Sequence, residues 1–279
     1  GMVDTPDGDW YAFMFQDRGA LGRAPVLMPM HFEDGFPIIG ENGKVPEVVT
    51  VLDTGYQYAA INGSDDFFYK PDENGQITLK NFWEFNHQQM DDFWSVTENP
   101  GHLRLHSAKL SPTLFQAYNT LTQRTVGPKC AAEVTLRFAH MKNGDVAGIS
   151  TFIGNYGFTG VKKENDQFYL IMMGRPAKDT TVFGQFEYEN PGLEYARVPI
   201  YGESICLRAE ADFTDKRDLS SFYYKEGDNW QKLGIDQPMY FKMDLFTGCR
   251  FGLFYYSTEQ TGGYVDFSKF QFIWPEYVY

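Results

Sequence analysis

The chain is short of several kinds of residue, and each shortage excludes a class of protein. Its 279 residues include only three cysteines, Cys130, Cys206 and Cys249, and no Cys-x-x-Cys pair. An odd, dispersed set of this kind supports neither a disulfide framework nor a cysteine zinc site. No stretch approaches the roughly 18 consecutive apolar residues that a membrane-spanning helix needs. We therefore expect no membrane insertion.

Basic residues are scarce relative to acidic ones. The sequence has 24 Lys and Arg against 37 Asp and Glu, a formal net charge of −13 at pH 7. Binding to a phosphate backbone or to an anionic lipid surface requires clustered Lys and Arg. The charge balance therefore predicts that neither nucleic acid nor a membrane is a partner.

The first residues lack the features of a secretory signal. Residues 1–6 contain no basic segment followed by an apolar one, and the Gly before Met2 resembles a tag remnant. No signal peptide is expected, and both a cytoplasmic and a secreted parent stay open.

Aromatic residues, by contrast, are abundant. There are 25 Phe, 18 Tyr and 5 Trp, and the hydrophobic fraction is 43%. Disordered chains carry few aromatics and too little apolar surface to offset chain entropy, so disorder is excluded. A chain of this length can bury a core without covalent staples, either as one large β domain or as two smaller domains.

Short alternating segments predict β-strands almost throughout. Within 133–138, for example, Val134, Leu136 and Phe138 share one face at a period of two residues. No window of ten or more residues shows a helical period, apart from a turn or two near 112–118. The expected strands are 10–15, 25–32, 48–52, 102–107, 133–138, 147–153, 167–173, 182–188, 204–211, 221–224, 250–256 and 264–273.

Many short strands with little helix predict an all-β, antiparallel two-sheet sandwich or a barrel. Pro29 suggests that its strand lies at a sheet edge, because proline cannot donate a ladder hydrogen bond. We expect a short β remnant over 1–45, a linker over 46–63 and the sandwich over 64–279.

Four ordered stretches carry more than generic β patterning. They are Phe82-Trp83-Glu84-Phe85-Asn86-His87 with 93–105, then 119–128, then 142–148, and finally 246–254 with 262–267. In this order they resemble the C-terminal concanavalin A-like β-sandwich of family 43 glycoside hydrolases, the β-xylosidase and α-arabinofuranosidase group. The resemblance implies a jelly-roll over roughly 64–279. Residues 8–25, continuing to 36–40, resemble the last blade of that family's five-bladed catalytic propeller.

The resemblance also implies inverting hydrolysis of xylan or arabinoxylan oligosaccharides. Inversion requires an acid and a base about 6.5–9.5 Å apart. In this family the acid usually lies in a Glu-Gly-Pro context, but here Glu226-Gly227 is followed by Asp228. The blades that carry the base and a second, tuning Asp are absent. We therefore expect an ancillary part without its own catalytic carboxylates, whose partners are carbohydrate and the upstream blades of the parent enzyme.

Two residues match substrate-binding positions of the family. Arg23 follows Gly22 as in the last blade, where the family's arginine lies near the bound sugar. Phe246 matches a phenylalanine that leans over the propeller's pocket. The alternatives are an exposed arginine after a glycine turn and a core aromatic at the start of a strand.

A set of aromatic and polar side chains could line a sugar-binding face of the sandwich, since aromatic rings stack on sugars and amides or guanidinium groups bind hydroxyls. Most aromatics of a sandwich are packed inside, however, so a structural role is the favoured interpretation. The set is Trp83, Asn86, His87, Trp94, Gln123 and Arg124.

No cofactor is expected. The five histidines are dispersed, and His102 and His106 would lie about 13 Å apart on a strand. Asp65-Asp66, Asp91-Asp92 and Asp266 could supply oxygen ligands for a structural calcium ion, but no spaced ligand loop is present, so solvated turn carboxylates are favoured.

Two other functions stay open: a stand-alone carbohydrate-binding module, and an enzyme that uses acidic residues of a sandwich cleft. In every case a lone blade cannot bury both of its faces. Residues 9–40 must therefore pack on the sandwich, pack on another copy of the chain, or be mobile.

Overall fold

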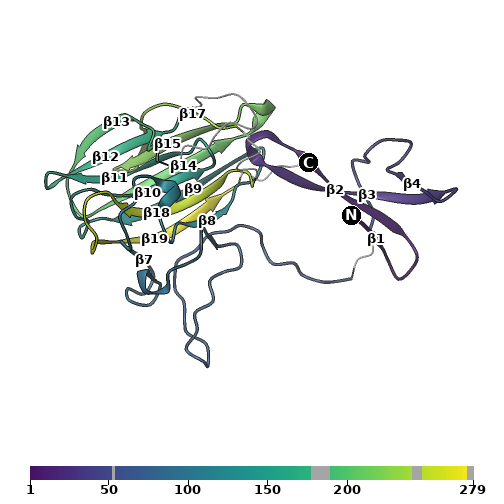
Figure 1. Cartoon of the computed structure of the whole chain (residues 1–279), viewed down its shortest axis with the longest axis horizontal. Helices are drawn as coiled ribbons and strands as arrows, with labels where there is room; N and C mark the ends of the chain where they lie inside the picture. Colours follow the sequence, from purple (N-terminus) through teal and green to yellow (C-terminus); the bar gives the residue numbers. More distant parts are fainter. Residues whose placement is uncertain (52–53, 177–188, 241–246, 275–279) are drawn as a thin grey trace. The chain divides into compact units, whose positions relative to one another are not determined.

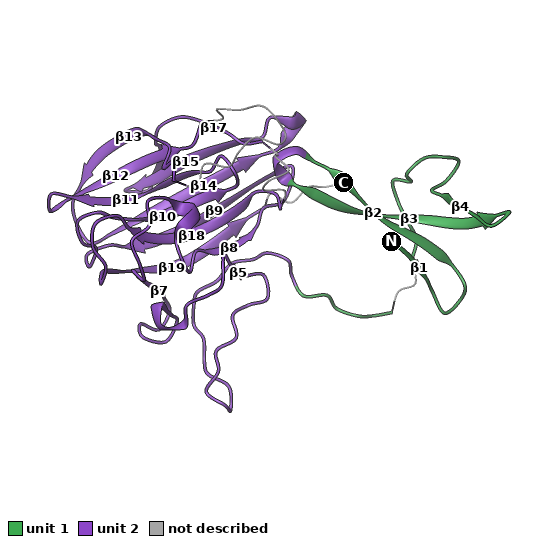
Figure 2. Cartoon of the chain, in the orientation of Figure 1, with its two compact units in different colours: residues 1–18, 22–59 green, residues 19–21, 60–279 purple. Residues whose placement is uncertain are grey.

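The structure is a computed structural model that describes residues 1–51, 54–176, 189–240 and 247–274. In these ranges nearly all regular structure is β. Two compact units are present, one formed by residues 1–18 and 22–59 and the other by residues 19–21 and 60–279 (Figure 2). No helix in the described ranges is long and apolar enough to cross a membrane.

The first unit is a four-stranded antiparallel sheet in the order β1-β2-β3-β4. Its strands are β1 (Met2–Asp4), β2 (Trp10–Asp17), β3 (Arg23–Glu33) and β4 (Phe36–Ile39). Ala12 pairs with Met28 across β2 and β3, and both belong to a small buried cluster. Phe13 and Phe15 lie on the opposite face of β2 from Ala12, and their side chains are 54% and 58% exposed. The sheet therefore leaves much of its apolar surface uncovered.

The expectation that Pro29 marks an edge strand is wrong. β3 pairs with β2 on one side and with β4 on the other. The carbonyl oxygen of Pro29 accepts the N–H of Gly40, the residue just past β4. On an antiparallel strand the N–H and C=O of one residue point the same way, so the missing N–H lies where the β3–β4 ladder ends.

The second unit is a sandwich of two antiparallel sheets, which lie face to face in Figure 1. Among the described residues, one sheet has seven strands in the order β13-β12-β11-β10-β18-β8-β5. The other has eight: seven follow the order β16-β15-β14-β9-β19-β7-β6, and the eighth, β17, pairs with β15. The strands are β5 (Glu84–Phe85), β6 (Trp94–Ser95), β7 (Leu103–His106), β8 (Leu121–Arg124), β9 (Lys129–Arg137), β10 (Asp145–Phe152), β11 (Gly157–Glu164), β12 (Gln167–Gly174), β13 (Leu193–Ile200), β14 (Ser204–Asp212), β15 (Leu219–Glu226), β16 (Asn229–Lys232), β17 (Gln237–Pro238), β18 (Arg250–Ser257) and β19 (Tyr264–Ile273). The short 3₁₀ turns are η1 (Gly19–Leu21), η2 (Asp91–Phe93), η3 (Leu114–Gln116) and η4 (Thr214–Lys216).

The core lies between the two sheets. Ile149 and Val161 enter it from the seven-stranded sheet, while Leu136 and Phe267 enter it from the eight-stranded one. These positions follow the period-two alternation of their strands, because every second side chain faces the partner sheet. The eight-stranded sheet turns its other face, which is mostly polar, outward.

The middle of the seven-stranded sheet, at β10 and β18, is buried on both faces. A second cluster covers its outer side, where Phe158 and Phe254 pack edge to face and the segment around η3 contributes Leu114 and Phe115. This explains why β10 and β18 are buried at almost every position rather than alternating.

The turn between β2 and β3 belongs to the sandwich unit. Ala20, in η1, is fully buried within the sandwich core. Its N–H donates to Asp218 Oδ2 at 3.0 Å, and its carbonyl oxygen accepts the N–H of Cys249 at 2.7 Å. Of the three fates predicted for residues 9–40, packing on the sandwich therefore applies to this turn.

Most predicted strands are present, and the all-β antiparallel sandwich is confirmed. The strand expected over 48–52 is wrong, because its described residues 48–51 carry no ladder pairing. The segment 182–188 lies outside the described residues. β11 and β13 were not predicted, since Gly157 and Gly160 interrupt the pattern of one and Pro199 that of the other.

Candidate functional site

Two of the six side chains considered for a sugar-binding face are interior. Trp83 is 7% exposed, and its indole N–H donates to Asp65 Oδ2 at 2.8 Å. Gln123 is fully buried and bonds both backbone groups of Gly63, at 3.0 and 3.1 Å. Neither side chain can reach a ligand at the surface, because each is buried and hydrogen-bonded to other residues of the fold.

Asn86 and His87 follow β5 and hold the segment near η3. The backbone N–H of Asn86 donates to the Thr120 carbonyl oxygen at 2.9 Å. His87 has a φ of 67°, and its Nε2 lies 2.6 Å from the Phe115 carbonyl oxygen. The His87 ring thus holds the turn, and Asn86 contributes its backbone N–H, while its buried Nδ2 has no hydrogen-bond partner among the described residues.

Trp94 and Arg124 lie on different sheets. Trp94, on β6, is half-buried against the core, with its ring centroid 5.0 Å from that of Phe85. Arg124, on β8, is exposed and lies 3.9 Å from a carboxylate oxygen of Glu84. The structure thus brings Trp83, Asn86, His87, Gln123 and Arg124 to the β5–β8 edge, but gives them no common open face with Trp94.

Arg23 lies in the first unit at the start of β3. Its Nε donates to Asp17 Oδ1 at 3.0 Å, and its guanidinium carbon lies 4.7 Å from the centroid of the Phe15 ring. Asp17 and Arg23 are direct partners across β2 and β3, so the guanidinium group is held on one face of the sheet. Phe246 lies outside the described residues.

Several of the acidic residues considered for calcium accept hydrogen bonds from protein donors. Asp65 accepts the indole N–H of Trp83, the hydroxyl of Tyr69 and an ion pair from Lys80. Asp91 accepts the side chain of Gln89 at 2.7 Å. Within the described ranges no group of three or more His, Cys, Asp or Glu is arranged to hold a metal ion.

Asp145 is a buried carboxylate near the turn before β10. It accepts the hydroxyls of Tyr255 at 2.6 Å and Ser257 at 2.5 Å, together with the N–H of Lys142. Burial raises the pKa of Asp145, and the three hydrogen bonds partly oppose that rise. Since all three donors belong to β18 or to its own turn, the carboxylate ties the turn to the sheet.

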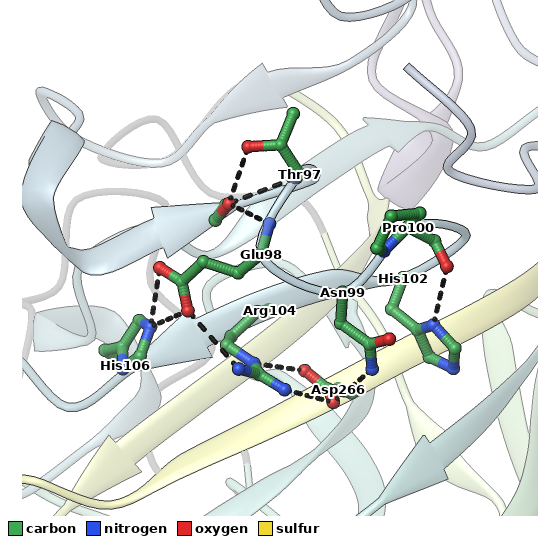
Figure 3. A network of polar contacts seen from close by, with 9 residues as sticks. Thr97, Glu98, Asn99, Pro100, His102, Arg104, His106 and Asp266 are labelled. Carbon is green, nitrogen blue, oxygen red and sulfur yellow. Dashed lines mark hydrogen bonds and ion pairs between the residues drawn. The ribbon is translucent and has the colours of Figure 1, made fainter. Parts of the chain in front are cut away.

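A polar network occupies the outer face of the eight-stranded sheet (Figure 3). Arg104 on β7 donates two hydrogen bonds, of 2.7 and 2.8 Å, to the carboxylate of Asp266 on β19. Asn99 Nδ2 donates to the same carboxylate at 2.8 Å. Glu98 bridges Arg104 and His106 at 3.3 and 3.1 Å. Burial alone would raise the pKa of Asp266, but hydrogen bonds from Arg104 and Asn99 hold it below its ordinary value.

The sequence itself matches a known domain. The profile of the β-xylosidase C-terminal concanavalin A-like domain matches residues 72–273. The chain belongs to this family. The whole match lies within the sandwich unit, so β-xylosidase C-terminal domain is the proper description of that unit.

The curated relatives that this chain matches are longer than the chain itself. A β-xylosidase of Formosa agariphila is 27% identical, over 97% of this chain and 47% of its own length. A xylosidase/arabinosidase of Butyrivibrio fibrisolvens is 26% identical, over 96% of this chain and 51% of its own length. The chain spans about half the length of these relatives.

Solved structures give the same picture. A bifunctional GH43-CE protein of Bacteroides eggerthii superimposes with a TM-score of 0.83 at 37% identity, over 98% of this chain and 33% of its own. A GH43 enzyme engineered to display both endo-xylanase and exo-arabinofuranosidase activity gives 0.82 at 28% identity, over 98% and 53%. The matches extend beyond the sandwich to nearly all of this chain.

The Arg104–Asp266 network of the β-xylosidase C-terminal domain was not predicted. The alternation of 102–107 places Arg104 on the outer face, but its carboxylate partner lies 162 residues away. The pairing of Arg104 with Asp266 across β7 and β19 is what joins them. A pair so distant in sequence leaves no local signal.

Proposed function

We propose that the chain is the C-terminal, ancillary part of an inverting glycoside hydrolase that acts on xylan or arabinoxylan oligosaccharides. In this proposal residues 1–45 form the last blade of the catalytic propeller, residues 46–63 a linker, and residues 64–279 the sandwich that buttresses the propeller and shapes the mouth of its pocket. The catalytic carboxylates belong to the preceding part of the enzyme. Arg23 and Phe246 would be the positions nearest the substrate.

One observation carries the proposal: the first unit is a single four-stranded sheet with uncovered aromatic side chains. Phe36 is 73% exposed, in addition to Phe13 and Phe15. A sheet of this size with apolar residues on both faces needs neighbouring layers, which the blades of a propeller supply to one another. The relatives, about twice as long, have the length to hold further blades.

The buried acids of the sandwich support a non-catalytic role. Asp145 and Asp266 each accept at least three protein hydrogen bonds. Asp65 is held by Trp83, Tyr69 and Lys80. A general acid or base must instead face a substrate with a free oxygen.

The experiment assays the intact chain on aryl β-xyloside and aryl α-arabinofuranoside, alone and mixed with the N-terminal half of the Formosa agariphila β-xylosidase. We expect no turnover by the chain alone, and turnover in the mixture that exceeds the activity of the added half. Turnover by the chain alone, abolished by one carboxylate-to-amide substitution, would instead show an enzyme in its own right.

A stand-alone carbohydrate-binding module is the second candidate function. It is favoured by a polar hollow on the outer face of the eight-stranded sheet, next to the Arg104–Asp266 network. Binding of xylan fragments by the intact chain, with no gain of activity when the upstream half is added, would favour this function over the first.

A further inference from the structure

A hollow of about 340 Å³ opens on the sandwich where β7, β9 and β19 lie side by side. Asp266 pairs with Arg104 on one side and with Arg137 on the other, so all three side chains share the outer face of the sheet. His140, in the loop after β9, and Glu203, before β14, complete the rim. No residue that lines the hollow lies outside the described ranges.

The walls of this hollow are already held in place. The Tyr264 ring has the Arg104 guanidinium carbon 4.2 Å from its centroid and is stacked on the His140 ring at 4.3 Å and 17°. Arg104 is fixed in turn by its two hydrogen bonds to Asp266. Side chains that are ordered beforehand lose little conformational entropy when a ligand arrives.

The hollow combines hydrogen-bond donors and acceptors with no excess of charge. Arg104 is matched by Asp266, and Arg137 lies 3.9 Å from Glu203. Asn99 uses its Nδ2 on Asp266, and His102 uses its Nδ1 on the Pro100 carbonyl oxygen. Among the described residues the Asn99 Oδ1 and His102 Nε2 atoms have no protein partner, so one acceptor and one ring nitrogen remain for a ligand.

This local neutrality distinguishes the hollow from the rest of a chain whose net charge is −13. A cation would meet Arg137 and Arg104, and an anion would meet Glu203 and Asp266. A sugar hydroxyl both donates and accepts hydrogen bonds, so a rim of alternating donors and acceptors suits a neutral saccharide better than either ion. The volume lies at the lower end of the range for ligand pockets, roughly 300–1,000 Å³, which fits a short saccharide.

We propose that this hollow is a saccharide-binding subsite of the sandwich, which takes a neutral sugar unit of a xylan-type chain. The choice of xylan rests on the proposed function, whereas the site itself rests on its geometry. Asn99, His102 and Arg137 bond the sugar hydroxyls, and the Tyr264–His140 stack forms the wall. Such a subsite would hold the polysaccharide on the ancillary part of the enzyme.

The test is a titration of the intact chain with xylotriose, followed through the imidazole signals of its five histidines by NMR. We expect the His102 and His140 signals to shift saturably at millimolar sugar, while the His31 and His87 signals stay in place. Absence of any shift at tens of millimolar xylotriose would overturn the proposal, and so would equal shifts of all five histidines. A larger affinity for glucuronic acid than for xylose would overturn the choice of a neutral ligand.

Two matched variants locate the binding. Arg137→Ala removes an exposed arginine of the rim, and Arg217→Ala removes an exposed arginine, also in a single ion pair, elsewhere on the unit. We expect Arg137→Ala to weaken xylotriose binding about fivefold or more, as the loss of one hydrogen-bonding partner does, and Arg217→Ala to leave it unchanged. Equal affinities of the two variants would place the sugar elsewhere. The readout is binding, so it is independent of the activity assay for the proposed function.

Discussion

The two compact units differ in how far they complete their own burial. In the sandwich, Phe251, Phe254 and Phe267 are fully buried, whereas Phe13, Phe15 and Phe36 of the four-stranded sheet are more than half exposed. Both units are built from the same kind of aromatic, alternating strands. The difference is that the sandwich has a second sheet to receive its apolar face, and an isolated sheet has none. Apolar strands therefore do not by themselves define a self-sufficient unit.

The largest expected difference between the two units comes from removing one phenylalanine ring from each. Phe267→Ala leaves a cavity between the two sheets and should lower the free energy of unfolding by about 3–5 kcal/mol. Phe36→Ala removes an exposed ring and should change it by less than about 0.5 kcal/mol. Urea denaturation of both variants measures the two effects. Similar losses would mean that the four-stranded sheet is also covered.

The next largest effect on stability is expected at the Arg104–Asp266 ion pair, on the outer face of the eight-stranded sheet. Asp266→Asn removes the carboxylate that accepts two hydrogen bonds from Arg104 and leaves the guanidinium group its longer contact with Glu98, so it should cost about 2–3 kcal/mol near neutral pH. The fold lowers the pKa of Asp266, so its contribution is present above the ordinary aspartate value and is lost as the pH falls through its lower folded value.

The cost of Asp266→Asn should therefore shrink below about pH 4. Thermal unfolding across a pH series checks this, with the exposed Asp228→Asn in the β15–β16 turn as the control. A cost that does not vary with pH would show that the carboxylate's charge is irrelevant.

The turn Gly19–Leu21 belongs to the sandwich unit, although the strands on either side of it belong to the four-stranded sheet. It therefore tests how far the sandwich holds the first unit in place. Asp218→Ala removes the acceptor of the Ala20 N–H and should cost about 1–2 kcal/mol. We expect a protease to cut first between residues 45 and 59, whose described parts, 45–51 and 54–59, lie outside any strand. The N-terminal fragment should then stay bound through the turn Gly19–Leu21. Gel filtration of nicked protein should show more release from Asp218→Ala than from Asp228→Ala.

The smallest effect concerns solubility rather than stability. Phe15→Ser exchanges an exposed ring for a small polar group, so the free energy of unfolding should change by less than about 0.5 kcal/mol. Self-association should fall, because large exposed apolar patches promote contact between molecules. Analytical ultracentrifugation over a concentration series measures this. An unchanged association constant would mean that this face takes no part in self-contact.

Alternating hydrophobicity predicted most strands correctly. It failed for a strand such as β11, which is buried on both faces and therefore does not alternate. The alternation in 133–138 and 264–273 marks β9 and β19, each with one face in the core. β11 was missed because its glycines and its position in a sheet covered on both sides remove the alternation. The segment 48–52 looked like a strand because it is rich in valine, yet nothing pairs with its described residues.

The candidate site shows the same division. Four ordered motifs resemble those of the family, and the profile match confirms the family. The motif residues Trp83 and Gln123 are buried, so in this chain they serve packing and hydrogen bonding within the fold. Arg104, Asp266 and Tyr264 come together only through the β7–β19 register, which no local pattern reveals.

The sequence by itself determined the all-β class, the family, the acidic charge and the position of most strands. The family follows from ordered motifs, and the other properties depend on composition and on contacts between near neighbours in the chain. Only the tertiary structure decided which aromatics lie inside, that β3 is a central strand, that Ala20 belongs to the sandwich core and that Arg104 meets Asp266. Those outcomes depend on which strands become neighbours, and strand order is set by contacts between residues far apart in the chain.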